Sequence, residues 1–193
     1  MTEEKKEYKN FKLMYSNLAM PGATEWLMQD TPLLRQIWTA NTTRQDKAIA
    51  LRHTENIHLR YINPPTDWDT RKANDILEVF DNQELMQAKA LKAIKERVIA
   101  VSEHMGCKDI GRIFISKLLA GKEVARHTDE GDYFSKYGRY HLILATNPDA
   151  ACEVDGEECH MPVGTVWWLE NGLPHAFWNR GTTDRLHVIW DAQ

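Results

Sequence analysis

The second half of the chain alternates short apolar stretches with turn residues, a pattern typical of β structure. From about residue 111 onward, Gly, Asn-Pro, Asp-Gly and Asn-Gly signals separate the stretches. We predict strands at residues 112–119, 123–127, 138–146, 152–159 (as a hairpin), 165–169, 175–179 and 185–190. Short strands at this spacing favour a mainly β fold with flanking helices, specifically a double-stranded β-helix of the jelly-roll or cupin-like kind. The concave interior of such a fold is a natural small-molecule site.

The first half of the chain has helical periodicity instead. Thr31-Pro32 predicts the start of a helix, and apolar residues recur at helical spacing from about residue 83 to residue 104. Residues 57–61 alternate between apolar and polar and predict a strand. The length fits a single domain over residues 1–193. Within it we expect a helix-rich support over about residues 1–108 and the jelly-roll core over about residues 110–191.

Three residues of the β half form a candidate metal site. His127 and Asp129 are two positions apart where a predicted strand runs into a loop, so their side chains face the same side. His175 begins another strand after Leu173-Pro174. Two imidazoles and one carboxylate on one face of a metal leave positions open, as in non-haem iron(II) oxygenases. We therefore expect these three residues to bind Fe(II), with open positions for a chelating 2-oxoacid and for O2.

Basic residues on the neighbouring strands indicate an anion site. Arg185 lies ten positions after His175, and its guanidinium suits the far end of a dicarboxylate. Strand alternation places Arg139 and His141 on one face. Two arginines inside a β cavity require an anion because unpaired buried charge is costly, and a bound co-substrate would supply it. The alternative for Arg139 and His141 is a structural ion pair or a polar strand face.

Four segments resemble one enzyme family. They are RIFISKLLAGKEVARHTD, GRYHLIL, GTVWWLENGLPHAFWN and DRLHVIWD. They are similar to the aspartyl/asparaginyl β-hydroxylase-like group of 2-oxoglutarate oxygenases, which also includes free-proline cis-4-hydroxylases. The resemblance covers roughly residues 110–191 and, more loosely, residues 52–60.

The resemblance implies a role for each matching residue. His127, Asp129 and His175 would be the iron ligands. Arg185 would bind the distal carboxylate of 2-oxoglutarate, with Ser116 as a hydroxyl donor. Arg139 and His141 would lie by the proximal carboxylate or by the carboxylate of the substrate.

The resemblance also implies an activity. It is a hydroxylase that uses Fe(II), 2-oxoglutarate and O2 on an amino acid, free or in a peptide, with Asp, Asn and Pro as first candidates. Vertebrate aspartyl β-hydroxylases have Gly at the position of Asp129, so here the chain looks more like bacterial enzymes that act on free amino acids. Two other classes stay open: a jelly-roll metal enzyme that does not use 2-oxoglutarate, and a binding module that has kept the fold. Arg185 and Arg139 argue against the first.

Composition narrows the range of partners. The formal net charge is −4 and no long run of Lys or Arg occurs, so a nucleic-acid partner is not expected. No stretch approaches the roughly 18 apolar residues that span a bilayer, and the charged first residues lack the apolar core of a secretory signal. We expect a cytoplasmic protein with no membrane contact and a small-molecule or peptide substrate. The sequence does not specify the oligomeric state.

Two of the three cysteines flank a hairpin signal. Counting outward from Asp155-Gly156 places Cys152 opposite Cys159. Opposed cysteines can form a disulfide in a suitable pair of the ladder. The other interpretation, two buried free thiols, is favoured in a reducing compartment.

Overall fold

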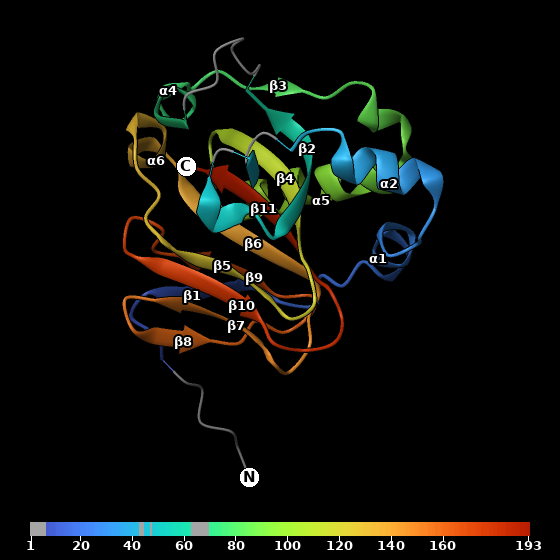
Figure 1. Ribbon diagram of the computed structural model, residues 1–193. Helices are drawn as coiled ribbons and strands as arrows, with labels where there is room; N and C mark the ends of the chain where they lie inside the picture. Colours follow the sequence, from blue (N-terminus) through green and yellow to red (C-terminus); the bar gives the residue numbers. More distant parts are fainter. Residues whose placement is uncertain (1–6, 43–44, 47, 63–69) are drawn as a thin grey trace.

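The computed structural model describes residues 7–42, 45–46, 48–62 and 70–193 of the chain, and its strands form two facing antiparallel sheets (Figure 1). The larger sheet contains, in spatial order, β1 (Phe11–Tyr15), β9 (Val166–Leu169), β6 (Gly138–Ala145), β11 (Arg185–Ala192), β4 (Ile110–Leu118), β2 (Thr54–Tyr61) and β3 (Phe80–Asp81). The smaller sheet contains β5 (Lys122–His127), β10 (His175–Asn179), β7 (Ala150–Val154) and β8 (Glu157–Cys159). The predicted mainly β, jelly-roll fold is confirmed.

Three helices, Pro21–Leu27, Pro32–Thr39 and Lys89–His104, cover the outer face of the larger sheet (Figure 1). The helical elements are α1 (Pro21–Leu27), α2 (Pro32–Thr39), η1 (Ile49–Leu51), α4 (Thr70–Asp75), η2 (Leu85–Gln87), α5 (Lys89–His104) and α6 (Asp132–Lys136). As predicted, α2 follows Thr31, whose side chain accepts a hydrogen bond from the Leu34 amide at 3.2 Å. Among the helices that the structure describes, none is long and apolar enough to cross a bilayer.

The long predicted helix begins later than its apolar spacing indicates. Leu85–Gln87 forms a separate 3-10 turn, and Ala88 is extended, with φ −78° and ψ 112°. The α-helix therefore starts at Lys89 rather than near residue 83, and it ends before Gly106, whose φ is +81°. The prediction of its start was wrong because the 3-10 turn keeps Leu85 packed against the same apolar core, so periodicity alone does not separate the two elements.

Strand alternation gives the larger sheet an apolar outer face, whereas its inner face carries both apolar and polar residues. Toward the helices it buries Ile57, Leu59, Ile113, Ile115, Leu142, Leu144, Leu186, Val188 and Trp190 against α5 residues Leu91, Ile94, Val98 and Val101. Burying each such side chain contributes about 1.5–3 kcal/mol relative to leaving it in water. This packing makes the sheet a rigid platform for whatever its other face carries.

The inner face, toward the smaller sheet, carries buried polar residues in rows. Asn56 on β2 pairs in register with Ser116 on β4, and Ser116 pairs with His187 on β11. Directly opposed residues of antiparallel strands point to the same face, so the three side chains form one row. All three are buried, and buried polar groups require partners, so this part of the sheet is built for polar contacts rather than for packing.

The hairpin between β7 and β8 has the predicted register. Asp155 and Gly156 both have positive φ, +48° and +84°, as a tight two-residue turn requires, and Cys152 lies opposite Cys159. Both cysteines are buried thiols outside any disulfide, which agrees with the second interpretation of this pair.

Candidate functional site

His127, Asp129 and His175 meet where the smaller sheet opens toward the larger one. His127 at the end of β5 pairs in register with His175 at the start of β10, and their ring centroids are 4.3 Å apart. His127 Nε2 lies 3.9 Å from Asp129 Oδ1. One ligand atom from each of the three residues lies within 4.8 Å of the other two. The structure thus brings all three predicted metal ligands together.

Backbone carbonyls fix the tautomer of both histidines. His127 Nδ1 lies 2.9 Å from the Ala125 carbonyl oxygen, and His175 Nδ1 lies 2.9 Å from that of Leu173. A carbonyl only accepts, so each Nδ1 carries the proton and donates it, and each Nε2 keeps its lone pair. Burial also lowers the pKa of His175, which favours the neutral ligand form. Metal-binding histidines typically have this second hydrogen bond.

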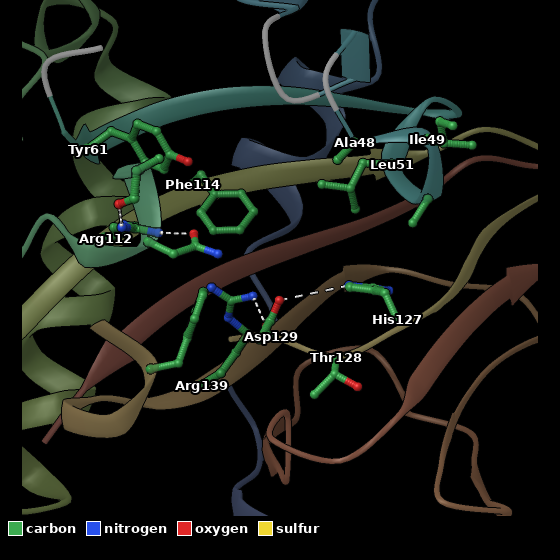
Figure 2. Close-up of a pocket in the computed structure, with 14 residues that line it drawn as sticks. Ala48, Ile49, Leu51, Tyr61, Arg112, Phe114, His127, Thr128, Asp129 and Arg139 are labelled. Atoms are coloured by element: carbon green, nitrogen blue, oxygen red, sulfur yellow. Dashed lines mark hydrogen bonds and ion pairs between the residues drawn. The ribbon is translucent and has the colours of Figure 1, made fainter. Parts of the chain in front are cut away.

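Asp129 is held so that one oxygen remains available. Its Oδ2 accepts from Arg139 Nη1 at 2.5 Å and from Asn171 Nδ2 at 3.1 Å, while Oδ1 faces His127. Figure 2 shows Asp129 between Arg139 and His127. Burial raises the pKa of this carboxyl, but Arg139, His175, His127 and the hydrogen bond from Asn171 together outweigh burial and bring the pKa to about 2. Two imidazole lone pairs and one ionised carboxylate oxygen are a donor set that fits Fe(II).

Arg139 is paired with carboxylates of the protein itself. Besides Asp129, it contacts Asp191, with Nε at 2.8 Å from Oδ1 and Nη2 at 3.2 Å from Oδ2. The two residues lie opposite each other on β6 and β11. Burial lowers the pKa of Arg139, but Asp129 and Asp191 outweigh it and raise the pKa above its ordinary value. The expectation that both inward arginines need an external anion is therefore wrong for Arg139, which forms the structural ion pair considered as its alternative.

Arg185 differs from Arg139 because no described carboxylate pairs with it. Its side chain is 3% exposed, its Nε has no hydrogen-bond partner among the described residues, and its guanidinium lies 5.0 Å from the centre of the Phe177 ring. Burial lowers its pKa to about 10, so it still carries a positive charge at neutral pH. An unpaired charge in the interior is costly unless a ligand neutralises it.

Two adjoining cavities meet at the candidate metal centre. The outer one has a volume of about 250 Å³, and Figure 2 shows Tyr61 and Arg112 across it from His127, with Phe114 between them. The inner one is lined by polar residues from the larger sheet: Thr54, Asn56, Ser116, Arg139, His141 and Arg185. Both share Leu51, Phe114, His127 and Arg139 in their walls. The structure thus places the predicted co-substrate residues Arg185, Arg139, His141 and Ser116 around one cavity.

Four residues of this region were missed by the sequence reasoning. Thr54 and Asn56 line the inner cavity, and Asn56 Nδ2 donates to Thr54 Oγ1 at 3.2 Å. Their alternation along β2 was a usable signal, as was that of Asp191 with Arg185 along β11. Asn171, which binds Asp129, lies in a loop and gives no periodic signal.

The segment after Asp129 contains a short helix, α6, that is anchored to the larger sheet. The Tyr133 hydroxyl accepts a hydrogen bond from the Arg112 amide at 2.7 Å, and the Arg112 guanidinium lies 3.7 Å from the centre of the Tyr133 ring. Arg112 Nη2 also donates to the Ala73 carbonyl at 2.5 Å, which ties α4 to the same wall. These contacts fix one side of the outer cavity.

Comparison with known proteins adds a family and a fold. The family model described as "Aspartyl/Asparaginyl beta-hydroxylase" matches residues 34–193. An L-proline cis-4-hydroxylase of Rhizobium meliloti (strain 1021) is 29% identical over 91 residues, which are 47% of this chain and 32% of that enzyme. The match therefore spans about a third of the length of this curated relative.

A solved structure extends the similarity over nearly the whole chain. The crystal structure of a prolyl-4-hydroxylase from Pseudomonas putida superposes with a TM-score of 0.51, covering 95% of this chain and 92% of that one. The sequence identity is 14%, so this likeness bears on the fold alone.

Proposed function

This chain belongs to the aspartyl/asparaginyl β-hydroxylase family, and on that premise we propose that it is an Fe(II)- and 2-oxoglutarate-dependent dioxygenase that hydroxylates an amino acid, free or in a peptide. One observation carries the proposal. The buried Arg185 guanidinium, with no carboxylate partner among the described residues, lines a cavity that adjoins a site of two histidines and one carboxylate. A dicarboxylate that also chelates a metal satisfies both features at once.

The metal would be held by His127 Nε2, Asp129 Oδ1 and His175 Nε2. Bound there, Fe(II) would supply the activation of O2 for oxidation of a C–H bond. The residues of the chain itself orient the side chains that would bind the metal. The Ala125 and Leu173 carbonyls hold the two imidazoles in the ligand tautomer.

Neutral and charged donors keep the carboxylate ligand in place. Arg139 and Asn171 together occupy Asp129 Oδ2, which leaves Oδ1 as the single ligand oxygen. Asp191 in turn fixes the Arg139 guanidinium through two hydrogen bonds. This chain of contacts runs from β11 through β6 to the metal ligand, so it positions Asp129 before any metal arrives.

The inner cavity would bind 2-oxoglutarate. Arg185 would form a bidentate pair with the distal carboxylate. Ser116, on the adjacent strand β4, would donate a hydrogen bond from its hydroxyl to the same carboxylate. His141 would contact the same molecule from β6. The apolar rings of Phe114 and Phe177 in the same wall would exclude water and so strengthen these charged contacts.

The outer cavity would bind the substrate. Its volume of about 250 Å³ suits a single small amino acid or one side chain of a peptide, and Tyr61, Phe114 and Phe134 give it an aromatic wall. The similarity to an L-proline cis-4-hydroxylase makes L-proline the first substrate to test, and the family description adds Asp and Asn.

The test is a succinate-release screen. The protein is loaded with Fe(II) under anaerobic conditions, given 2-oxoglutarate, and exposed to O2 with L-proline, L-aspartate, L-asparagine or short peptides containing them. We expect one of these to stimulate succinate release, and we expect His127→Ala to abolish it. His104→Ala is the matched control, because His104 is exposed at the end of α5. Iron-loaded protein that leaves 2-oxoglutarate unconsumed with and without every amino acid would refute the proposal.

A further inference from the structure

His141 and His187 form a buried histidine pair behind the inner cavity. Their Nδ1 atoms are 3.1 Å apart, and their rings are nearly perpendicular, at 87°. His141 lies on β6 and His187 on the adjacent strand β11, where it faces Ser116 of β4, and both histidines are buried. The proposed function uses His141 but assigns nothing to His187.

The contact between the two Nδ1 atoms fixes the tautomers as complementary. Burial, together with the nearby charge of Arg185, lowers the pKa of both histidines well below the ordinary value, so both rings are neutral at neutral pH. A neutral imidazole has one proton, on one of its two nitrogens. A hydrogen bond between two Nδ1 atoms needs one donor and one acceptor. The accepting ring must therefore carry its proton on Nε2.

The remaining nitrogen of His141 has no hydrogen-bond partner in the described part of the chain. Its Nε2 is buried and makes no hydrogen bond to any described residue, although His141 lines the cavity that contains Arg185 and Ser116. The ring stacks on Phe177, with centroids 5.4 Å apart and an interplanar angle of 16°, which restrains its rotation. If Nε2 carries the proton, it can donate to a carboxylate oxygen. If it carries the lone pair, it repels that oxygen.

We propose that His187 is a positioning residue that donates its Nδ1–H to His141 Nδ1 and so holds His141 in the Nε2–H tautomer, ready to donate to a carboxylate oxygen of 2-oxoglutarate. The inference rests on the proposed function because it names the same co-substrate. It explains why a buried strand position between Leu186 and Val188 carries an imidazole. An apolar side chain at 187 would leave His141 free to adopt either tautomer.

The first test distinguishes the loss of the hydrogen-bond donor at residue 187 from a change in side-chain volume. His187→Leu removes the donor at similar volume, whereas His187→Asn keeps an amide donor close to the position of Nδ1. In Zn(II)-loaded protein without O2, we expect His187→Leu to raise the Kd for 2-oxoglutarate about tenfold or more, and His187→Asn to recover most of the affinity. In turnover with Fe(II), KM for 2-oxoglutarate should rise more than kcat falls. A purely structural role predicts equal Kd values once both variants are shown to be folded, and that result would overturn the inference.

A double-variant cycle tests whether His187 acts through His141. With His141→Leu already in place, His187→Leu should change the Kd for 2-oxoglutarate by less than about twofold. An undiminished effect in that background would mean that His187 does not act through His141 and would overturn the inference.

The second test needs no variant and therefore does not depend on variants folding. Nitrogen-15 NMR of histidine-labelled, Zn(II)-loaded wild-type protein with 2-oxoglutarate reports which ring nitrogen carries each proton. We expect His141 protonated at Nε2 and His187 at Nδ1, and the reverse assignment would overturn the inference. If the wild type fails to bind 2-oxoglutarate at all, the proposed function falls together with this inference. If it binds and the His187 results contradict the expectation, only the inference falls.

Discussion

Replacing Arg185 by Met should stabilise the metal-free protein while removing its response to 2-oxoglutarate. Burial lowers the pKa of Arg185 from 12.5 to about 10. A difference of one pKa unit corresponds to about 1.4 kcal/mol, so the buried charge destabilises the fold by roughly 3 kcal/mol at neutral pH. The effect is a destabilisation because burial disfavours the charged form of Arg185, and this form dominates at every pH below the folded pKa. Met keeps the apolar contact with Phe177 and removes the charge.

The expected gain is smaller than the full cost because Met does not fill the same volume. We expect Arg185→Met to raise the free energy of unfolding by about 1–3 kcal/mol, and Tm by roughly 5 °C, at about 2–4 °C per kcal/mol for a chain of this size. The wild type should gain about 2.7 kcal/mol from 2-oxoglutarate at a concentration of 100 times Kd. The variant should gain almost nothing, because losing hydrogen bonds to a charged group costs about 1.5–3 kcal/mol each.

The assay is denaturant unfolding of Mn(II)-loaded and metal-free protein, with and without 2-oxoglutarate. Arg180→Met is the matched control, because Arg180 is exposed and stacks over Trp178 at 4.8 Å. It should change stability by less than about 0.5 kcal/mol and keep the full ligand response. If Arg185→Met instead loses stability while 2-oxoglutarate still stabilises it, the assignment of Arg185 as the carboxylate clamp is wrong. A jelly-roll metal enzyme that does not use 2-oxoglutarate would then be favoured.

Three further predictions concern the metal ligands and their support. His175→Ala should abolish tight Mn(II) binding in calorimetric titration, whereas His104→Ala should leave it unchanged; equal affinities would exclude His175 as a ligand. Arg139→Met should lower the free energy of unfolding by about 3–5 kcal/mol, because it leaves Asp129 and Asp191 buried without their counter-charge, and a loss below about 1 kcal/mol in urea unfolding would contradict this. Since the folded pKa of Asp129 is about 2 against an ordinary 3.8, its contribution is present above pH 4 and is lost as the pH falls toward 2. That contribution is about 2 kcal/mol, and Asp129→Asn should flatten the acid limb of the stability curve of the metal-free protein, so an unchanged limb would argue against the ion pair.

The local pattern of the chain was enough to predict most strands of the core and to identify the candidate ligands. Alternation with a period of two placed Asp129, just beyond the end of β5, on the same side as His127, and the turn at Asp155-Gly156 set the pairing of Cys152 with Cys159. These are properties of one strand or one hairpin. The backbone geometry of a single element dictates them, so they can be read without knowing the rest of the fold.

What could not be predicted depends on which strands become neighbours. Arg139 meets Asp191 only because β6 and β11 pair, and Asn171 reaches Asp129 only through a loop. Phe11–Tyr15 becomes an edge strand because β9 offers a free edge, and its own residues carry only a weak strand signal. The sequence thus marked Arg139 as a buried charge, but it did not show that the protein supplies the counter-charge. The contact between His187 and His141 could not be predicted either, because the two residues lie on different strands, β11 and β6.

The central claim is that one buried site couples a metal held by two histidines and a carboxylate to a dicarboxylate co-substrate. The most direct measurement follows 2-oxoglutarate and succinate together in Fe(II)-loaded wild-type protein when O2 is admitted, beside Asp129→Ala and Arg185→Met. We expect one succinate to form for each 2-oxoglutarate consumed by the wild type, and neither variant to turn over at a 2-oxoglutarate concentration that saturates the wild type. Equal succinate formation in all three proteins, or bound iron with no consumption of 2-oxoglutarate in the wild type, would contradict the account.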